Sequence, residues 1–308
     1  MRHFLIDTDT ASDDAMAILM ALREPAVHVE AITVVAGNLP LSLCVRNALI
    51  SIEQAQTYEP PVYAGLALPM LRQQVTAEET HGDDGMGNMG LADPVLQLQP
   101  EHAVDQIIAT AHRFPGELEI VALGPLTNLA VAMLREPRLP ELVKHLYIMG
   151  GAGLGPGNAT PVAEFNIYAD AEAAQIVIGS PMAKTLVGWD ICMGSAYLNW
   201  DDVEKLRSVG RLGEFSVRCN ATLIEGNKLW GREGFDPADP TAMAAALYPD
   251  MISQQFSAYC YVEYKSEACY GQLVIDQLHV TNKPHNANIV VELAPQQFKQ
   301  CLFDLMAD

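Results

Sequence analysis

Long hydrophobic runs, positive charge and paired cysteines are all scarce in this sequence of 308 residues. No uninterrupted apolar stretch approaches the roughly 18 residues that a transmembrane helix needs, so we expect no membrane partner. Only 18 Lys and Arg stand against 38 Asp and Glu, and the resulting net charge of −20 disfavours binding to the phosphates of nucleic acid. Half of the residues are apolar, which excludes a disordered chain.

The six cysteines are dispersed along the chain, and none of them forms a Cys-x-x-Cys pair. Such spacing is typical of reduced thiols rather than of a disulfide framework or a zinc site. Near the start of the chain, only the short apolar run Phe4-Leu5-Ile6 precedes an acidic cluster, which is too little for a signal peptide. Both observations predict a cytoplasmic protein.

Short apolar strands alternate with helical patterns through most of the chain. Strands are predicted at 4–6, 27–35, 118–123, 146–149, 184–187, 256–264 and 288–293. Helices are predicted at 13–24, 42–57, 101–113, from 126 onwards, at 170–178, through most of 190–248, and at the end of the chain. This alternation predicts a single α/β domain over residues 1–308, with a mostly parallel, open twisted sheet flanked by helices. The glycine-rich stretch 66–94 is predicted to be a long loop.

Four aspartates follow the first predicted strand within eight residues: Asp7, Asp9, Asp13 and Asp14. In open α/β sheets, ligands bind at the carboxyl ends of the strands. Carboxylates held together at one strand end need raised pKa values or a cation, and oxygen ligands suit the hard ions Ca²⁺ and Mg²⁺. A solvated acidic loop with a helix-capping acid would explain the same residues without a ligand.

A strand followed by Asp7-x-Asp9 also resembles the first motif of haloacid-dehalogenase-like phosphatases. That resemblance implies Asp7 as nucleophile, Asp9 as acid and base, and Mg²⁺ as cofactor. However, Ala11 departs from the Thr or Val usual in that motif, and the pair Asp13-Asp14 has no role in it.

The motif Asp7-Thr-Asp9-Thr-Ala-Ser-Asp13-Asp14 more closely resembles the N-terminal motif of the inosine–uridine-preferring nucleoside hydrolase family. Further motifs appear in the order of that family, and the resemblance extends over about residues 3–250. They are Val35-Ala36-Gly37-Asn38, His81-Gly82-Asp83-Asp84-Gly85, Leu123-Gly124-Pro125-Leu126-Thr127-Asn128, Met149-Gly150-Gly151, Gly157-Asn158 with Ala163-Glu164-Phe165-Asn166, Asp170-Ala171-Glu172-Ala173-Ala174, and Asp239-Pro240.

The resemblance implies an enzyme, a ribonucleoside N-ribohydrolase that converts nucleosides to free base and ribose in nucleoside catabolism and salvage. It implies one Ca²⁺ per subunit, bound by Asp9, Asp14, Asp239 and the carbonyl of Leu123, with Asp13 as the base that activates a water on the metal. It implies a substrate site formed by Asn38, His81, Met149, Asn158, Glu164 and Asn166. It also implies a homodimer or homotetramer. Carboxylates around the sugar would stabilise the oxocarbenium-like ribose of the transition state.

Two expectations concern the side of the site that faces the base. Many relatives carry a histidine before the last aspartate, where it protonates the departing base, but this chain has Ala238. Trp230 falls near an aromatic residue of pyrimidine-preferring relatives and is predicted to stack on the base, which favours pyrimidine or broad specificity.

Glu164 and Asn166, two residues apart in a segment predicted to be extended, should point the same way.

Ala238 also supports an alternative, a non-catalytic homologue that binds calcium and ribose. Retention of Asp13, the implied base, argues against this alternative.

Overall fold

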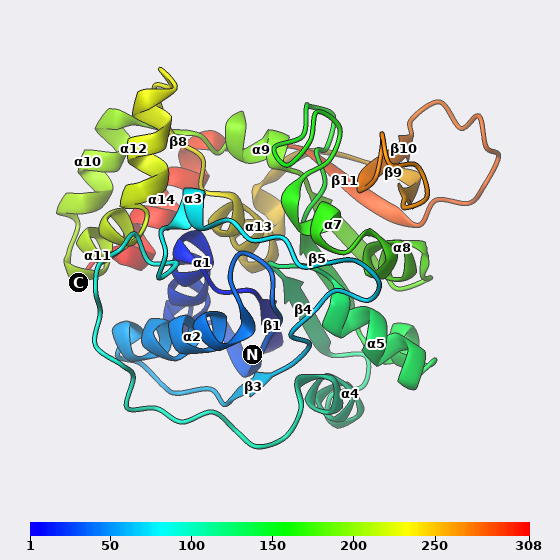
Figure 1. The fold of residues 1–308 in the computed structure, drawn as a ribbon, viewed down its shortest axis with the longest axis horizontal. Helices are drawn as coiled ribbons and strands as arrows, with labels where there is room; N and C mark the ends of the chain where they lie inside the picture. Colours follow the sequence, from blue (N-terminus) through cyan, green and yellow to red (C-terminus); the bar gives the residue numbers. More distant parts are fainter.

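The computed structural model describes residues 1–308 and places nine strands in one sheet (Figure 1). The sheet order is β10-β9-β11-β6-β5-β4-β1-β2-β3. The strands are β1 (Arg2–Thr8), β2 (Val27–Val34), β3 (Val62–Ala64), β4 (Leu118–Ala122), β5 (His145–Met149), β6 (Lys184–Val187), β9 (Ile252–Glu263), β10 (Gln272–Asp276) and β11 (Ala287–Leu293). The seven strands from β11 to β3 pair in parallel, whereas β9 and β10 pair antiparallel. This confirms the predicted single α/β domain with a mostly parallel open sheet.

The connection between β3 and β4 reverses the direction in which strands are added. The chain adds β2 and β3 on one side of β1 and then returns to place β4 on the other side. The carboxyl ends of β1 and β4 therefore form a topological switch point, the place where open α/β sheets bind ligands.

Helices cover both faces of the sheet because successive strand residues point in opposite directions. Phe4 and Ile6 of β1 belong to one apolar cluster, and Leu5 belongs to a second cluster on the other face. The first cluster includes residues of α1 (Ser12–Arg23), α2 (Leu41–Ala55), α13 (Ala238–Leu247) and α14 (Pro295–Met306). The second includes residues of α4 (Ala103–Arg113), α5 (Thr127–Arg135) and α8 (Ala171–Gly179). Every residue of α1 except Arg23 is buried, which explains its apolar composition.

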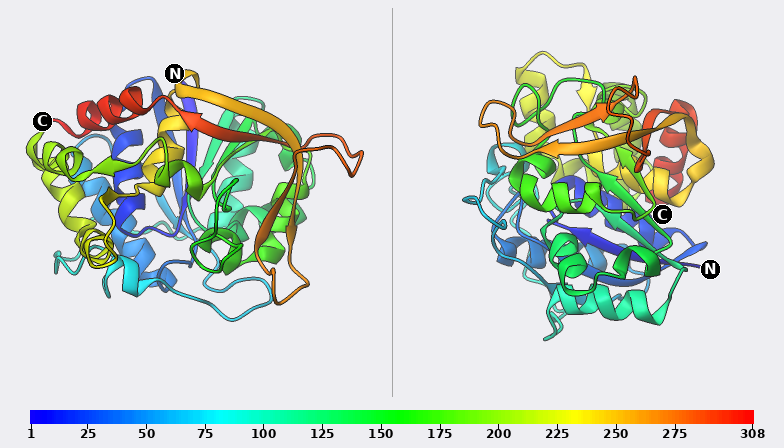
Figure 2. Two further views of the ribbon diagram at one scale, coloured as in Figure 1. Left: turned by 90° about the horizontal axis from the view of Figure 1, so that it is seen from above. Right: turned by 90° about the vertical axis from the view of Figure 1, so that its right-hand side faces the viewer.

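The two ends of the molecule differ in structure (Figures 1 and 2). Helices α10 (Trp200–Ser208), α11 (Arg211–Cys219) and α12 (Ala221–Leu229) lie at one end, and the antiparallel strands β9 and β10 lie at the other. The remaining elements are short: α3 (Glu78–His81), α6 (Leu139–Leu142), α7 (Phe165–Ala169), α9 (Trp189–Met193), a 3₁₀ turn at Pro249–Met251, and the two-stranded ribbon of β7 (Leu198–Asn199) and β8 (Gly234–Phe235). None of the helices combines the length and the apolar character needed to cross a bilayer.

The structure corrects the expected secondary structure in several places. The segment with Glu164 and Asn166 is not extended, because the Glu164 side chain accepts hydrogen bonds from the backbone N–H groups of Asn166 and Ile167 and so caps α7. The predicted loop 66–94 contains the short helix α3. Strands β3, β7, β8 and β10 were not predicted: β3, β7 and β8 have only two or three residues each, and β10 is an edge strand that depends on pairing with β9. All six cysteines are free thiols, as expected.

Candidate active site

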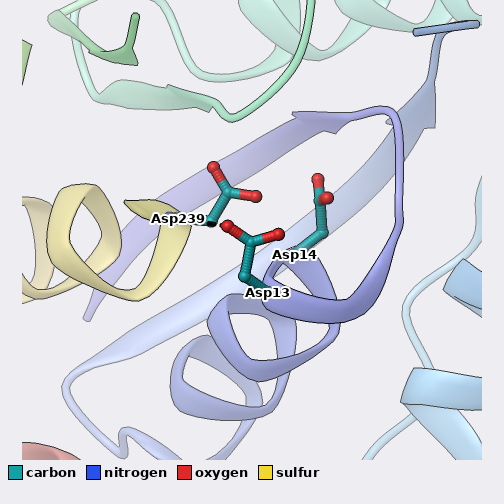
Figure 3. Close-up of side chains that lie close together, drawn as sticks. All are labelled: Asp13, Asp14 and Asp239. Carbon is teal, nitrogen blue, oxygen red and sulfur yellow. Dashed lines mark hydrogen bonds between the residues drawn. The ribbon is translucent and has the colours of Figure 1, made fainter. Parts of the chain in front are cut away.

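Three aspartates from two helices converge at the carboxyl edge of the sheet (Figure 3). Asp13 and Asp14 lie in the first turn of α1, and Asp239 lies in the first turn of α13. One carboxylate oxygen from each lies within 4.8 Å of the others, and all three residues are buried. The positive ends of the two helix dipoles offset only part of this charge. The arrangement therefore provides oxygen ligands for a cation.

Asp9 lies close to these three aspartates without belonging to the triplet. Its Oδ2 accepts a hydrogen bond of 2.7 Å from the backbone N–H of Asn38, whereas its buried Oδ1 has no hydrogen-bond partner. A β-carbon at Gly37 or Gly124 would overlap the carboxylate of Asp9. Glycine at both positions therefore makes room for a carboxylate whose free oxygen is available to a ligand.

The carboxylates of this cluster share an unfavourable electrostatic environment. Burial, followed by repulsion from Asp14, raises the pKa of Asp9 well above its usual range. The same two causes raise the pKa of Asp239, and burial together with the charge of Asp13 raises the pKa of Asp14. A hard divalent cation would remove this penalty, because it neutralises the charges and takes the free oxygen as a ligand. The chemistry of the donor set fits the expected metal.

A cavity of about 700 Å³ opens beside the aspartates, a size suited to a small-molecule ligand. Asp13, Leu123 and Asp239 line it, whereas Asp9 and Asp14 do not. All the residues that the sequence predicts to bind substrate also line it. They are Asn38, His81, Met149, Asn158, Glu164, Asn166 and Trp230.

Two polar side chains of the cavity, Asn166 and Glu164, are held by hydrogen bonds to the backbone. Asn166 donates from Nδ2 to the carbonyl of Leu123 at 2.7 Å, which places an amide beside the predicted metal ligand. Glu164 accepts from the backbone N–H groups of Gly151 and Asn166, both at 2.8 Å. Burial raises the pKa of Glu164 to about 7. These contacts fix both side chains at the edge of the sheet before a ligand arrives.

His81 lies on the short helix α3, and its side chain reaches the first turn of α1. Its Nδ1 lies 2.7 Å from the hydroxyl of Ser12 and 3.8 Å from a carboxylate oxygen of Asp13. Burial lowers the pKa of His81 below its usual value. The predicted loop therefore contributes a fixed histidine.

The part of the cavity around Trp230, called the base end below, contains residues with no predicted role in the site. They are Trp189, Arg232 and Asp236, which lie near the predicted Trp230 and the substituted position Ala238. Trp230 follows the last residue of α12, and its side chain is 67% exposed, so it is not a core aromatic. Asp236 had a signal in the sequence, because it stands three residues before Asp239. Trp189 and Arg232 had none.

Asp7 lies outside this cavity. Its buried Oδ1 accepts hydrogen bonds from Thr33 Oγ1 at 2.6 Å and Asn128 Nδ2 at 2.9 Å, and burial raises its pKa to about 7. A nucleophile must reach the substrate, and Asp7 does not line the cavity. The geometry therefore disfavours the phosphatase hypothesis.

An aspartate cluster beside a small-molecule cavity, at the switch point of a parallel sheet, defines an α/β enzyme with a site that can hold a metal. Comparisons with known proteins specify the class. Residues 4–300 match the family model described as inosine-uridine preferring nucleoside hydrolase. The chain belongs to this family, and it is a ribonucleoside N-ribohydrolase. The phosphatase hypothesis is therefore wrong.

Individual relatives agree over nearly the whole chain. The pyrimidine-specific ribonucleoside hydrolase RihB of Escherichia coli O157:H7 is 36% identical over 299 residues, which cover 96% of this chain and 94% of the relative. The solved structure of the plant nucleoside hydrolase PpNRh1 superposes with a TM-score of 0.93 at 29% identity, covering 99% of both chains. The purine-preferring ribonucleoside hydrolase of Gardnerella vaginalis superposes with a TM-score of 0.91 at 25% identity, covering 99% of this chain and 98% of the other.

Proposed function

We propose that this enzyme is a Ca²⁺-dependent hydrolase of pyrimidine ribonucleosides, formed by residues 1–308 as one nucleoside-hydrolase domain. The observation that carries the proposal is the convergence of buried aspartates from α1 and α13 beside a cavity of nucleoside size. One Ca²⁺ per subunit would be held by Asp9, Asp14, Asp239 and the carbonyl of Leu123. This Ca²⁺ site is supported by the free, buried Oδ1 of Asp9 and by the raised pKa values of Asp9 and Asp239.

Different residues of the chain would perform different steps of the reaction. A cation held by the proposed metal ligands would supply a positive centre that makes a nearby water more acidic. Asp13 accepts a proton from the attacking water, whose hydroxyl forms a bond to C1′ of the ribose. Asn38, Asn158, Glu164 and Asn166 bind the sugar, and the carboxylates stabilise the positive charge that develops on it.

Three observations support a free nucleoside as substrate, and the first of them also favours a pyrimidine base. The E. coli relative at 36% identity is named a pyrimidine-specific enzyme. Trp189 and Trp230 at the base end of the cavity offer aromatic surfaces for a base. The net charge of −20 and the acidic cavity favour a neutral nucleoside over a nucleotide, whose phosphate would be repelled.

A ribose-release assay tests the proposal with uridine, cytidine and inosine. Uridine or cytidine should give the highest kcat/KM, and the activity should disappear with a calcium chelator and return with added Ca²⁺. Faster release from inosine would contradict the pyrimidine assignment, and full activity in excess chelator would contradict the calcium assignment. Ribose binding without release from any nucleoside would support the non-catalytic alternative that Ala238 suggests.

The expected homodimer or homotetramer and the cytoplasmic location stay predictions. Light scattering coupled to size-exclusion chromatography would test the first, and cell fractionation the second.

A further inference from the structure

The base end of the cavity needs a group that stabilises the departing base. When the bond between C1′ and the base nitrogen breaks, both electrons stay with that nitrogen, and the base leaves as an anion unless something compensates the charge. Ala238 lines this part of the cavity and has nothing to donate. Among the residues that line the cavity, Arg232 is the single Lys or Arg.

The guanidinium of Arg232 lies between two aromatic rings of the cavity wall. Its Cζ is 5.7 Å from the ring centre of Trp189 and 5.5 Å from that of Trp230. Both rings line the same cavity as the guanidinium, so a base bound beside either ring lies near it. Because the side chain is only 30% exposed, a charged hydrogen bond there is screened less than one at the open surface.

One edge of the guanidinium is held, and the other is free. Nη1 donates to Asn227 Oδ1 at 3.2 Å and to Asp236 Oδ2 at 3.4 Å. Asp236 is itself fixed, because its Oδ1 accepts a hydrogen bond of 2.7 Å from Asn227 Nδ2. The N–H groups of Nη2 and Nε have no hydrogen-bond partner in the chain. Three donors are thus oriented and available to a ligand.

A simple surface ion pair would explain the contact between Arg232 and Asp236, but it would not explain why the pair lies inside the cavity. Asp236 is 5% exposed and lines the same cavity, so the pair lies inside the substrate site. A transition state is stabilised best by hydrogen-bond donors that are already fixed at the position where its charge develops.

We propose that Arg232 binds the departing base and stabilises its negative charge by donating N–H groups to an exocyclic carbonyl oxygen of the base. The inference rests on the proposed function and specifies a base with a carbonyl next to the glycosidic nitrogen, as in uracil. The C1′–N bond breaks with its electron pair on the base, the hydroxyl of water forms the new bond to C1′, and the proton of that water passes to Asp13. Arg232 gives up no proton, so the base anion takes its proton from solvent after departure, and Asp13 releases its own to solvent.

A matched pair of substrates tests this role, because 5-fluorouridine differs from uridine by one small atom that makes the base anion more stable. Arg232→Gln should lower kcat/KM for uridine by about tenfold to a hundredfold, the range of one charge-assisted hydrogen bond. The loss for 5-fluorouridine should be several-fold smaller, so the ratio of the two substrates rises in the variant. Each ratio is measured in one preparation, so a reduced fraction of folded enzyme does not affect it.

Two variants complete the design. Arg232→Lys keeps the charge without the forked donors and should give a ratio between those of the wild type and Arg232→Gln; it also replaces the Gln variant if that one fails to fold. Arg207→Gln, on α10 outside the cavity, should leave both rates unchanged.

Two results would overturn the role of Arg232: an unchanged substrate ratio in Arg232→Gln, or a folded variant that is inactive on both substrates. The failure of the proposed function is distinguishable, because the wild type itself would then release no ribose from either nucleoside.

Discussion

The two ends of the cavity are built differently. At the end where we propose that the sugar binds, called the sugar end below, Asp13 and Asp239 are buried in the first turns of helices that pack against the sheet. At the base end, Trp230 follows the last residue of α12 and is 67% exposed. In the proposed function, the groups that break the bond therefore lie at the edge of the sheet. The proposed base site is formed by side chains from more peripheral elements, where specificity can change without loss of the chemistry.

The largest expected effect comes from removing a metal ligand at the sugar end. Asp239→Ala should lose Ca²⁺ binding and bring ribose release below detection, because the remaining carboxylates become uncompensated buried charges. Calorimetry with Ca²⁺ and the ribose-release assay measure the two losses. Asp250→Ala, an exposed aspartate just beyond the same helix, is the matched control and should behave like the wild type.

A change in the substrate should come next. The 2′-deoxy analogue of uridine should react up to about 10⁴-fold more slowly in kcat/KM, because a missing hydroxyl leaves buried polar groups of the sugar end unpaired. Equal rates with uridine and 2′-deoxyuridine would show that the sugar end does not recognise the ribose diol.

Removing the proposed base should slow the reaction while leaving binding in place. Asp13→Ala should lower kcat by about 10³-fold, within the range typical of general-base catalysis, and should still bind ribose. Steady-state kinetics and ribose titration separate the two effects. A kcat close to that of the wild type would show that another group activates the water.

The smallest effect should come from the base end. Trp230→Ala should raise KM for uridine about tenfold, at the lower side of what base stacking on an aromatic ring contributes, because the ring is largely exposed. Leu229→Ala removes a neighbouring side chain that is 87% exposed and does not line the cavity, and it should leave KM unchanged. A large fall in kcat for Trp230→Ala would contradict the division between the two ends.

The same division explains how much of the molecule could be predicted from the sequence. The aspartates at the first strand and the alternation of strands and helices are local patterns, so the parallel sheet and the acidic edge were predictable. The approach of Asp239 to Asp14 depends on the packing of α13 against α1 and was anticipated only through the resemblance to a family.

The base end was less predictable because its residues come from separate segments. Arg232 and Trp189 have no motif of their own, and only the tertiary fold brings them to one cavity. The local error at Glu164 had a similar cause: two polar residues with a spacing of two fit a strand, but the carboxylate caps a helix.

The central claim is that Asp9, Asp14 and Asp239 hold one Ca²⁺ on which the reaction depends. Calorimetric titration of the metal-free wild-type protein and of Asp9→Ala with Ca²⁺, with ribose release followed on the same samples, tests it most directly. We predict one Ca²⁺ per chain and restored activity for the wild type, and neither for Asp9→Ala. Full activity of the metal-free wild type, or unchanged Ca²⁺ binding by Asp9→Ala, would contradict the claim.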